Sequence, residues 1–149
     1  MQRNTLSPAE QLYAGVQLTR PLLRYITSRV EADLSGTGIG VGQRAILEVL
    51  LAIGPATAPK ITKALDVKRQ FVGRELKEMV AKGMVSATDN PQRKGAMIYS
   101  LTQESRKMIE EIRSREMTEF AAFAERFTSE QIEAFYNVQH ALYEAFSKP

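Results

Sequence analysis

Apolar residues recur at helical spacing from close to the N-terminus. Residues 7–10, SPAE, form a capping-box start: the serine is the N-cap, the proline takes the first helical position and the glutamate reaches back to the cap. The apolar pattern that follows fades in the glycine-rich stretch 35–42. Pro21 interrupts it, which predicts either one kinked helix or two helices that meet near Thr19.

The same periodicity predicts three more helices in the flanking parts of the chain. Residues 41–53 repeat apolar positions at three and four, and glycine and proline at 54–55 end that helix. Thr102 caps a long helix, and residues 128–131, TSEQ, form a second capping box that begins another. The last two helices carry five of the six phenylalanines. This stripe either packs within a monomer or forms a dimer interface with the N-terminal helix, and we prefer the dimer because buried interface patches are rich in aromatics.

A short helix is predicted over residues 56–67, in the middle of the chain. Thr57 is its N-cap, and three apolar residues point inward: Ile61, Ala64 and Leu65. Asp66 follows, and Asp is one of the few residues other than glycine that tolerates a left-handed backbone, as a helix-turn-helix requires.

A second central helix covers residues 68–83, with Gly83 as its C-cap. Its apolar face holds Phe71 or Val72, together with Leu76, Met79 and Val80. A hairpin then follows from two short β-type runs, 83–88 and 97–99, which are joined by a turn with Arg93 and Lys94 at its tip. Helix, turn, helix and basic hairpin in this order describe a winged helix-turn-helix.

Charge is distributed unevenly along the 149 residues, although the net charge is only +3. Residues 57–107 hold eleven Lys or Arg against five acids, whereas residues 108–149 hold four against eight. The basic middle third predicts a polyanion-binding centre whose flanks have another role.

Several classes of function are disfavoured by the composition. The chain has no cysteine, which excludes disulfides and thiol-based sensing, and His140 is the only histidine. His140 and Glu144 are spaced for two metal ligands on one helix, but two ligands do not make a site, so we predict no metal and no catalytic residues. There is no long apolar run and no signal-peptide pattern, so a cytoplasmic location and no membrane partner are the expectation.

The middle of the chain resembles the MarR family of bacterial transcription regulators, named for multiple antibiotic resistance. The resemblance covers residues 39 to about 110 and rests on the stretches "GPATAPKITKALDVKRQFVGRELKEMVAKGMV" and "NPQRKGAMIYSLT". It implies a mainly α fold with a small β-hairpin wing, in one unit over 1–149. Residues 40–102 would be the winged helix-turn-helix, and residues 6–36 and 103–149 the flanking dimerisation helices.

The resemblance implies a cytoplasmic homodimer that binds double-stranded DNA at a pseudo-palindromic operator, as a repressor without a cofactor. Arg69 and Gln70 are the candidates for reading bases, because Arg suits guanine and Gln suits adenine. The other predicted DNA-binding residues are Thr57, Lys60, Lys68, Arg74, Lys77, Arg93 and Lys94. Each of these residues taken alone has a plain alternative as part of a solvated helix face.

Three positions depart from the family pattern. Gly95 stands where relatives often carry the wing arginine that enters the minor groove. Lys68 replaces the usual Ser or Asp at a helix start, and Ser105 replaces a glycine. The wing is therefore expected to contact DNA one or two residues earlier, or to contribute less.

Members of this family often release DNA when a small aromatic or phenolic acid binds between the dimerisation helices and the winged domain. The resemblance implies such an effector here, with Tyr13, Arg20, Arg24, Tyr25 and Arg44 in the corresponding region. These residues have equally ordinary roles in packing and surface charge. The alternative function is a winged-helix protein-interaction module without specific DNA binding.

Overall fold

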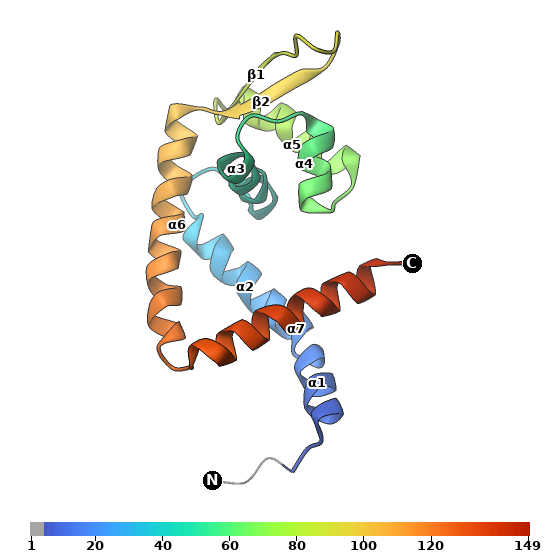
Figure 1. Cartoon of the computed structure of the whole chain (residues 1–149). Coiled ribbons are helices and arrows are strands. Elements are labelled where there is room, and N and C mark those ends of the chain that lie inside the picture. The colour runs from blue at the N-terminus through green and yellow to red at the C-terminus, as the bar shows by residue number, and fades with distance from the viewer. Residues whose placement is uncertain (1–4) are drawn as a thin grey trace. The chain divides into compact units, whose positions relative to one another are not determined.

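Seven α-helices and one two-stranded hairpin make up residues 5–149, the part of the chain that the computed structural model describes (Figure 1). Their bounds are α1 Pro8–Gln17, α2 Thr19–Asp33, α3 Val41–Ile53, α4 Ala58–Leu65, α5 Arg69–Ala81, β1 Val85–Asp89, β2 Met97–Leu101, α6 Gln103–Ala124 and α7 Ser129–Ser147. The predicted mainly α fold with a hairpin wing is confirmed. The chain divides into two compact units between Ser105 and Arg106.

The N-terminal helices follow the capping and proline signals. The Ser7 hydroxyl accepts a hydrogen bond from the Glu10 N–H at 3.2 Å, and the Ser7 N–H donates to Glu10 Oε1 at 3.1 Å. α1 ends at Gln17 and α2 begins at Thr19, so the pattern forms two helices. Pro21 lies in the first turn of α2, where its missing N–H leaves no helical hydrogen bond unmade.

The core of the first unit lies among α3, α4, α5 and the hairpin. Side chains from each of these elements are almost completely buried: Ile46, Leu47, Leu50, Ile61, Val72, Leu76, Met79 and Val85. α3 packs against α4, α5 and β2, which makes it the central helix of this unit. The burial of these apolar side chains supplies most of the free energy that holds α5 and the hairpin in place.

The prediction that Ala64 and Val80 point inward is wrong. Ala64 is exposed, because Ile61 and Leu65 are four residues apart and set the buried face of the eight-residue α4. Val80 is 38% exposed, since Met79 occupies the core position and its neighbour falls at the rim. Phe71 and Val72 are the predicted alternatives for the apolar face of α5. Val72 is fully buried, whereas Phe71 is half-buried.

The turn between α4 and α5 has the predicted left-handed residue. Asp66 has φ 53° and ψ 51°, and it is the only non-glycine residue with positive φ among the described residues. Such a backbone lets α5 leave at a new angle directly after α4.

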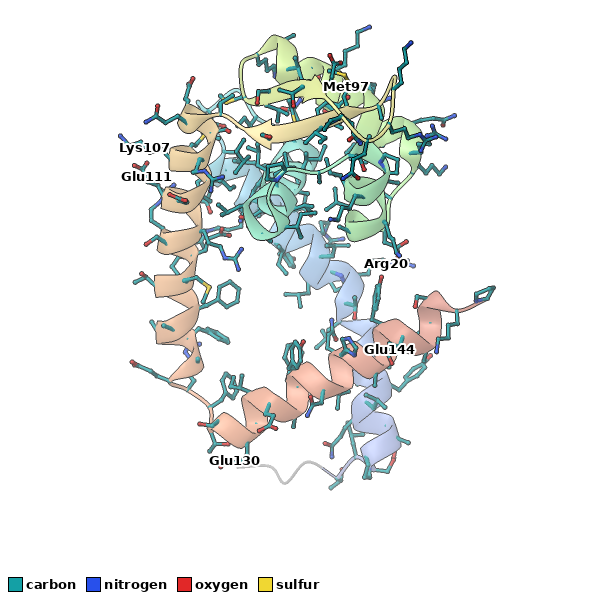
Figure 2. The ribbon with its side chains drawn as sticks, turned by 45° about the horizontal axis from the view of Figure 1, so that its top comes forward. Arg20, Met97, Lys107, Glu111, Glu130 and Glu144 are labelled. Atoms are coloured by element: carbon teal, nitrogen blue, oxygen red, sulfur yellow. The ribbon has the colours of Figure 1, made fainter. Side chains whose placement is uncertain are left out.

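β1 and β2 pair antiparallel in a hairpin (Figure 2). The register runs from Val85 opposite Leu101 to Asp89 opposite Met97. A third segment joins it, because Ala56 and Tyr99 exchange two backbone hydrogen bonds of 3.0 and 2.8 Å. This bridge anchors the wing to Ala56, two residues before the start of α4. The position of the wing relative to α4 is thus set by backbone pairing.

Capping boxes begin both C-terminal helices. Thr102 Oγ1 accepts from the Ser105 N–H at 3.2 Å, and Ser105 Oγ accepts from the Thr102 N–H at 3.1 Å. Ser105 is fully buried, and its hydroxyl is satisfied by this exchange. Thr128 and Gln131 make the corresponding pair at the start of α7, at 2.9 and 3.1 Å. The caps at Thr102 and Thr128 are confirmed.

The second unit consists of α6, from Arg106 onward, and α7. Glu130 lies in the first turn of α7, where a negative charge suits the positive helix end (Figure 2). Five phenylalanines of this unit remain 45–77% exposed in the single chain, four on the helices and Phe127 in the turn between them: Phe120, Phe123, Phe127, Phe135 and Phe146. Within residues 5–149, no helix is long and apolar enough to cross a bilayer.

Candidate nucleic-acid interface

The start of α5 presents its polar residues to solvent. Lys68 holds the N-cap position with extended backbone, φ −72° and ψ 138°, but its side chain does not cap the helix. Arg69 and Gln70 follow in the first turn and are exposed. Farther along the helix, Lys77 is exposed and the Arg74 side chain is 74% exposed. The buried residues Val72 and Leu76 thus leave a basic outer face on α5.

A hollow of about 350 Å³ brings together four predicted residues from three parts of the first unit. Thr57 comes from the N-terminal end of α4, Arg69 from α5, and Arg93 and Lys94 from the wing turn. Its other lining residues are uncharged: Ala58, Pro59, Gly95, Ala96, Met97 and Tyr99. Three cations and a helix N-terminus around one hollow produce a positive potential that favours an anion.

The wing turn explains one departure from the family pattern. Gly95 has φ 84°, a left-handed backbone that side-chain-bearing residues rarely adopt. The Asn90 N–H donates to the Ala96 carbonyl at 3.0 Å and closes the turn around it. An arginine at position 95 would be strained in this turn, whereas Arg93 and Lys94 precede the glycine and reach the hollow.

The remaining predicted residues lie outside this hollow. Lys60, Lys68, Gln70, Arg74 and Lys77 are exposed but do not line it. Thr57 has N-cap backbone, φ −80° and ψ 160°, although its side chain makes no capping hydrogen bond. The predicted set therefore divides into four residues around the hollow and five exposed residues on α4, on α5 or at the N-cap of α5.

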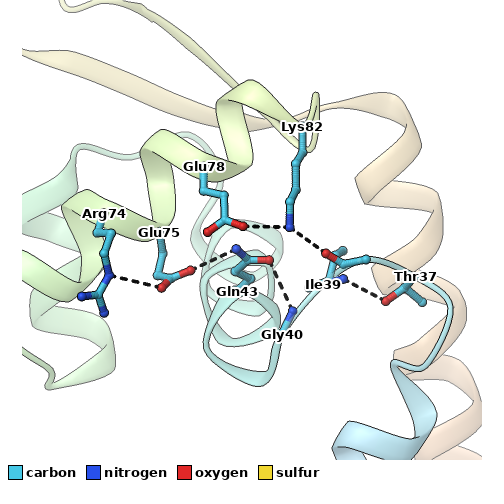
Figure 3. Close-up of polar contacts among 9 residues, drawn as sticks. Thr37, Ile39, Gly40, Gln43, Arg74, Glu75, Glu78 and Lys82 are labelled. Carbon is cyan, nitrogen blue, oxygen red and sulfur yellow. Dashed lines mark hydrogen bonds and ion pairs between the residues drawn. The ribbon is translucent and has the colours of Figure 1, made fainter.

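A polar network that the sequence analysis missed holds α5 on α3 (Figure 3). Gln43 is 5% exposed; its Nε2 donates to Glu75 Oε2 at 3.0 Å, and its Oε1 accepts from the Gly40 N–H at 3.3 Å. Glu75 Oε1 lies 3.7 Å from Arg74 Nε. The available signal was a glutamine in the first turn of a mostly apolar helix, but its partner is 32 residues away in sequence.

Lys82 makes a second connection at the far end of α5 (Figure 3). Its Nζ lies 3.0 Å from Glu78 Oε1 and donates to the Gly38 carbonyl at 2.8 Å. The hydrogen bond from Lys82, followed by its charge, lowers the pKa of Glu78 below the ordinary value of 4.5. The middle of α5, through Glu75, is thereby tied to α3, and its C-terminal end, through Lys82, is tied to the segment that precedes α3.

Comparison with known proteins identifies the family. A crystal structure of the MarR family transcription regulator SP03579 is 42% identical to this chain, with 93% of this chain and 92% of that one covered and a TM-score of 0.85. The chain belongs to the MarR family of transcription regulators. No protein-family model and no curated protein matches it.

More distant solved structures share the fold. Streptococcus pneumoniae FabT, solved in complex with DNA, is 16% identical over 91% of this chain and 97% of that one, with a TM-score of 0.79. Bordetella bronchiseptica BpsR, whose DNA binding is regulated by 6-hydroxynicotinic acid, is 15% identical over 87% and 98%, with a TM-score of 0.70. In this MarR-family chain, α4 and α5 are the helix-turn-helix and β1–β2 is the wing.

The residues predicted to bind an effector in this MarR-family chain are distributed over three helices. Tyr13 lies on α1 and is 68% exposed; on α2, the Arg24 guanidinium lies 5.3 Å from the ring centre of the 67% exposed Tyr25. Arg44 is half-buried on α3, with its Nη2 3.4 Å from Glu48 Oε1. Arg20 is exposed on α2. None of these residues lines the hollow at the wing, and their role stays a prediction.

His140 contacts two other residues of α7. Its ring stacks on Tyr136 with centroids 6.2 Å apart, and its Nδ1 lies 3.7 Å from Glu144 Oε1. Over residues 5–149, no group of three or more His, Asp or Glu side chains is arranged to hold a metal ion. His140 and Glu144 form a surface pair one turn apart.

Proposed function

We propose that this MarR-family protein is a homodimeric repressor that binds a pseudo-palindromic operator through α5 and the wing. The observation that carries this proposal is the convergence of Arg69, Arg93 and Lys94 on the hollow beside the start of α4. In a helix-turn-helix dimer, the two α5 helices enter successive major grooves about one helical turn apart. The wing cations then lie against the backbone, where phosphate contacts fix position.

Different contacts are proposed for different parts of the basic face. Arg69 and Gln70, in the first exposed turn of α5, read bases. The other residues bind phosphate or sugar oxygens: Thr57, Lys60, Lys68, Arg74, Lys77, Arg93 and Lys94. FabT, which shares this fold, was solved in complex with DNA.

The homodimer is supported by the apolar surface of the second unit. α6 and α7 border an apolar hollow of about 760 Å³, whose lining includes Phe120, Phe123, Phe127, Ile132 and Phe135. Exposed apolar surface of this kind on a single chain marks an interaction site. A second copy of the chain, contributing its own apolar helices, would bury it.

Binding to the protein's own promoter across a salt series tests the proposal. Specific binding should saturate, and its log–log salt slope should correspond to roughly six or more neutralised phosphates per dimer. Sedimentation in parallel should give a dimer at micromolar concentration. Absence of a saturable complex at low salt would favour the alternative, a winged-helix protein-interaction module.

Release by a small aromatic or phenolic acid belongs to the same proposal. BpsR provides the precedent, since 6-hydroxynicotinic acid regulates its DNA binding. Tyr13, Tyr25, Arg20, Arg24 and Arg44 supply the aromatic rings and guanidinium groups that such an acid would require. Adding candidate acids to the promoter–protein complex tests for release directly.

A further inference from the structure

A carboxylate is fixed on the basic face of α5, next to one of its cations. The Glu75 side chain is only 16% exposed, whereas that of Arg74 is 74% exposed. Their charged groups approach to 3.7 Å, between Glu75 Oε1 and Arg74 Nε. Glu75 is thus the largely buried partner of the pair, and Arg74 is the solvent-exposed one.

The position of Glu75 is set from the α3 side. Gln43, itself 5% exposed, donates to Glu75 Oε2 at 3.0 Å and leaves the other carboxylate oxygen toward Arg74 (Figure 3). The Gln43 carbonyl oxygen is occupied by the Gly40 N–H, which fixes the orientation of the amide. A buried amide held at both ends keeps the carboxylate from turning freely into solvent.

The structural role of this carboxylate is its hydrogen bond with Gln43, which joins α5 to α3. Its ion pair with Arg74 adds little to folding stability, because the arginine side chain is 74% exposed. Next to DNA, however, a negative charge repels phosphates and competes with them for the neighbouring guanidinium. Glu78, the second acid of α5, differs from Glu75 in its cation, because it binds Lys82.

We propose that Glu75 is a fixed counter-charge, oriented by Gln43, that weakens the hold of Arg74 on DNA phosphates and keeps binding to random sequences weak. This inference rests on the proposed function, in which Arg74 is a phosphate contact. Random DNA is held almost entirely by phosphate contacts, whereas an operator also offers base contacts. Limiting one phosphate contact therefore limits background binding on every sequence.

The test measures binding of a labelled random-sequence duplex by the full-length protein, wild type and Glu75→Gln, across a salt series. Glutamine keeps an oxygen that can accept from Gln43 but removes the charge. Glu75→Gln should bind random DNA about three- to tenfold more tightly at about 0.1 M salt, with a salt slope steeper by about one per subunit. Glu75→Ala should change affinity in the same direction, so the result does not depend on one variant.

Two controls separate a local effect from a change in net charge. Glu31→Gln removes the same charge from an exposed site on α2 and should leave binding close to wild type. In an Arg74→Gln background, Glu75→Gln should lose most of its effect, because the competed cation is gone.

The possible failures are distinguishable. Unchanged or weaker binding by both folded Glu75 variants would overturn the inference, as would an equal gain in the Arg74→Gln background. If Arg74→Gln by itself left binding unchanged, the phosphate role of Arg74 would be wrong, and the inference with it. If the wild-type protein showed no salt-dependent DNA binding, the proposed function itself would be contradicted.

Discussion

The ring of Phe71 lies directly over Gly42, so that a Cβ added at Gly42 would stand 2.5 Å from Phe71 Cζ. Phe71 belongs to the first turn of α5 and Gly42 to the first turn of α3. The two helices therefore approach closely at the end of α5 that presents Arg69 and Gln70. A hollow of about 270 Å³ beside the ring also borders Gln43 and Glu75.

Gly42→Ala should lower the free energy of unfolding by about 1 kcal/mol, at the lower end for overpacking, because the ring can turn toward the neighbouring hollow. In a Phe71→Ala background, the same substitution should be neutral or stabilising, since alanine is favoured over glycine inside a helix. Urea denaturation of the four proteins measures the coupling. If the two substitutions had additive effects on the free energy of unfolding, the Phe71 ring would not be what limits the side-chain size at position 42.

Asp66→Val should destabilise the protein by about 1–2 kcal/mol, because a β-branched side chain strongly disfavours the left-handed backbone of the turn. Asp66→Asn provides the matched control and should stay within about 0.5 kcal/mol of wild type, because asparagine tolerates the same conformation. Thermal unfolding of both variants tests this. An equal loss of stability in both variants would assign the effect to the carboxylate instead of the backbone.

Glu78 makes part of the stability dependent on pH. Its pKa is lowered in the folded protein by Lys82, so the pair stabilises the fold above the unfolded-state value near 4.5. That contribution is lost as the pH falls below 4.5 and through the lower pKa of the folded state. Glu78→Gln should melt at a lower temperature than wild type at pH 7, and the difference should shrink at pH 3. A difference that is constant with pH would contradict the assignment.

Arg69→Ala should reduce discrimination between operator and random DNA by about 1–3 kcal/mol, since it removes the proposed base contact. Lys77→Ala should weaken binding to both DNAs similarly, as expected of a phosphate contact. Anisotropy titrations of both duplexes at one salt concentration give the two ratios. An unchanged ratio for Arg69→Ala would refute its role as a base reader.

Phe135→Asp should convert the proposed dimer to a monomer, because a charge would be buried where two copies are proposed to meet. Phe135 is 65% exposed in the single chain and lines the apolar hollow of α6 and α7, so the substitution disturbs little packing within the chain. Sedimentation measures the outcome. Glu133→Gln, on the same helix, is the control and should remain dimeric; a dimeric Phe135→Asp would place the interface elsewhere.

The sequence by itself determined the elements whose signals are local. The caps at Ser7, Thr102 and Thr128 each join residues three apart, and the left-handed Asp66 follows from the turn between two periodic segments. Such interactions depend on short stretches of chain, so residue types at fixed spacing predict them. The basic wing and the outer face of α5 followed in the same way from charge and periodicity.

Only the tertiary structure decided which distant residues meet. The backbone bridge between Ala56 and Tyr99 brings the wing cations to the start of α4, and Gln43 reaches Glu75 across 32 residues. Nothing in the local pattern marks Gly42 as the site that receives the Phe71 ring. These contacts depend on how α3, α5 and the hairpin pack around a shared core, and packing is a property of the whole unit and not of any one segment.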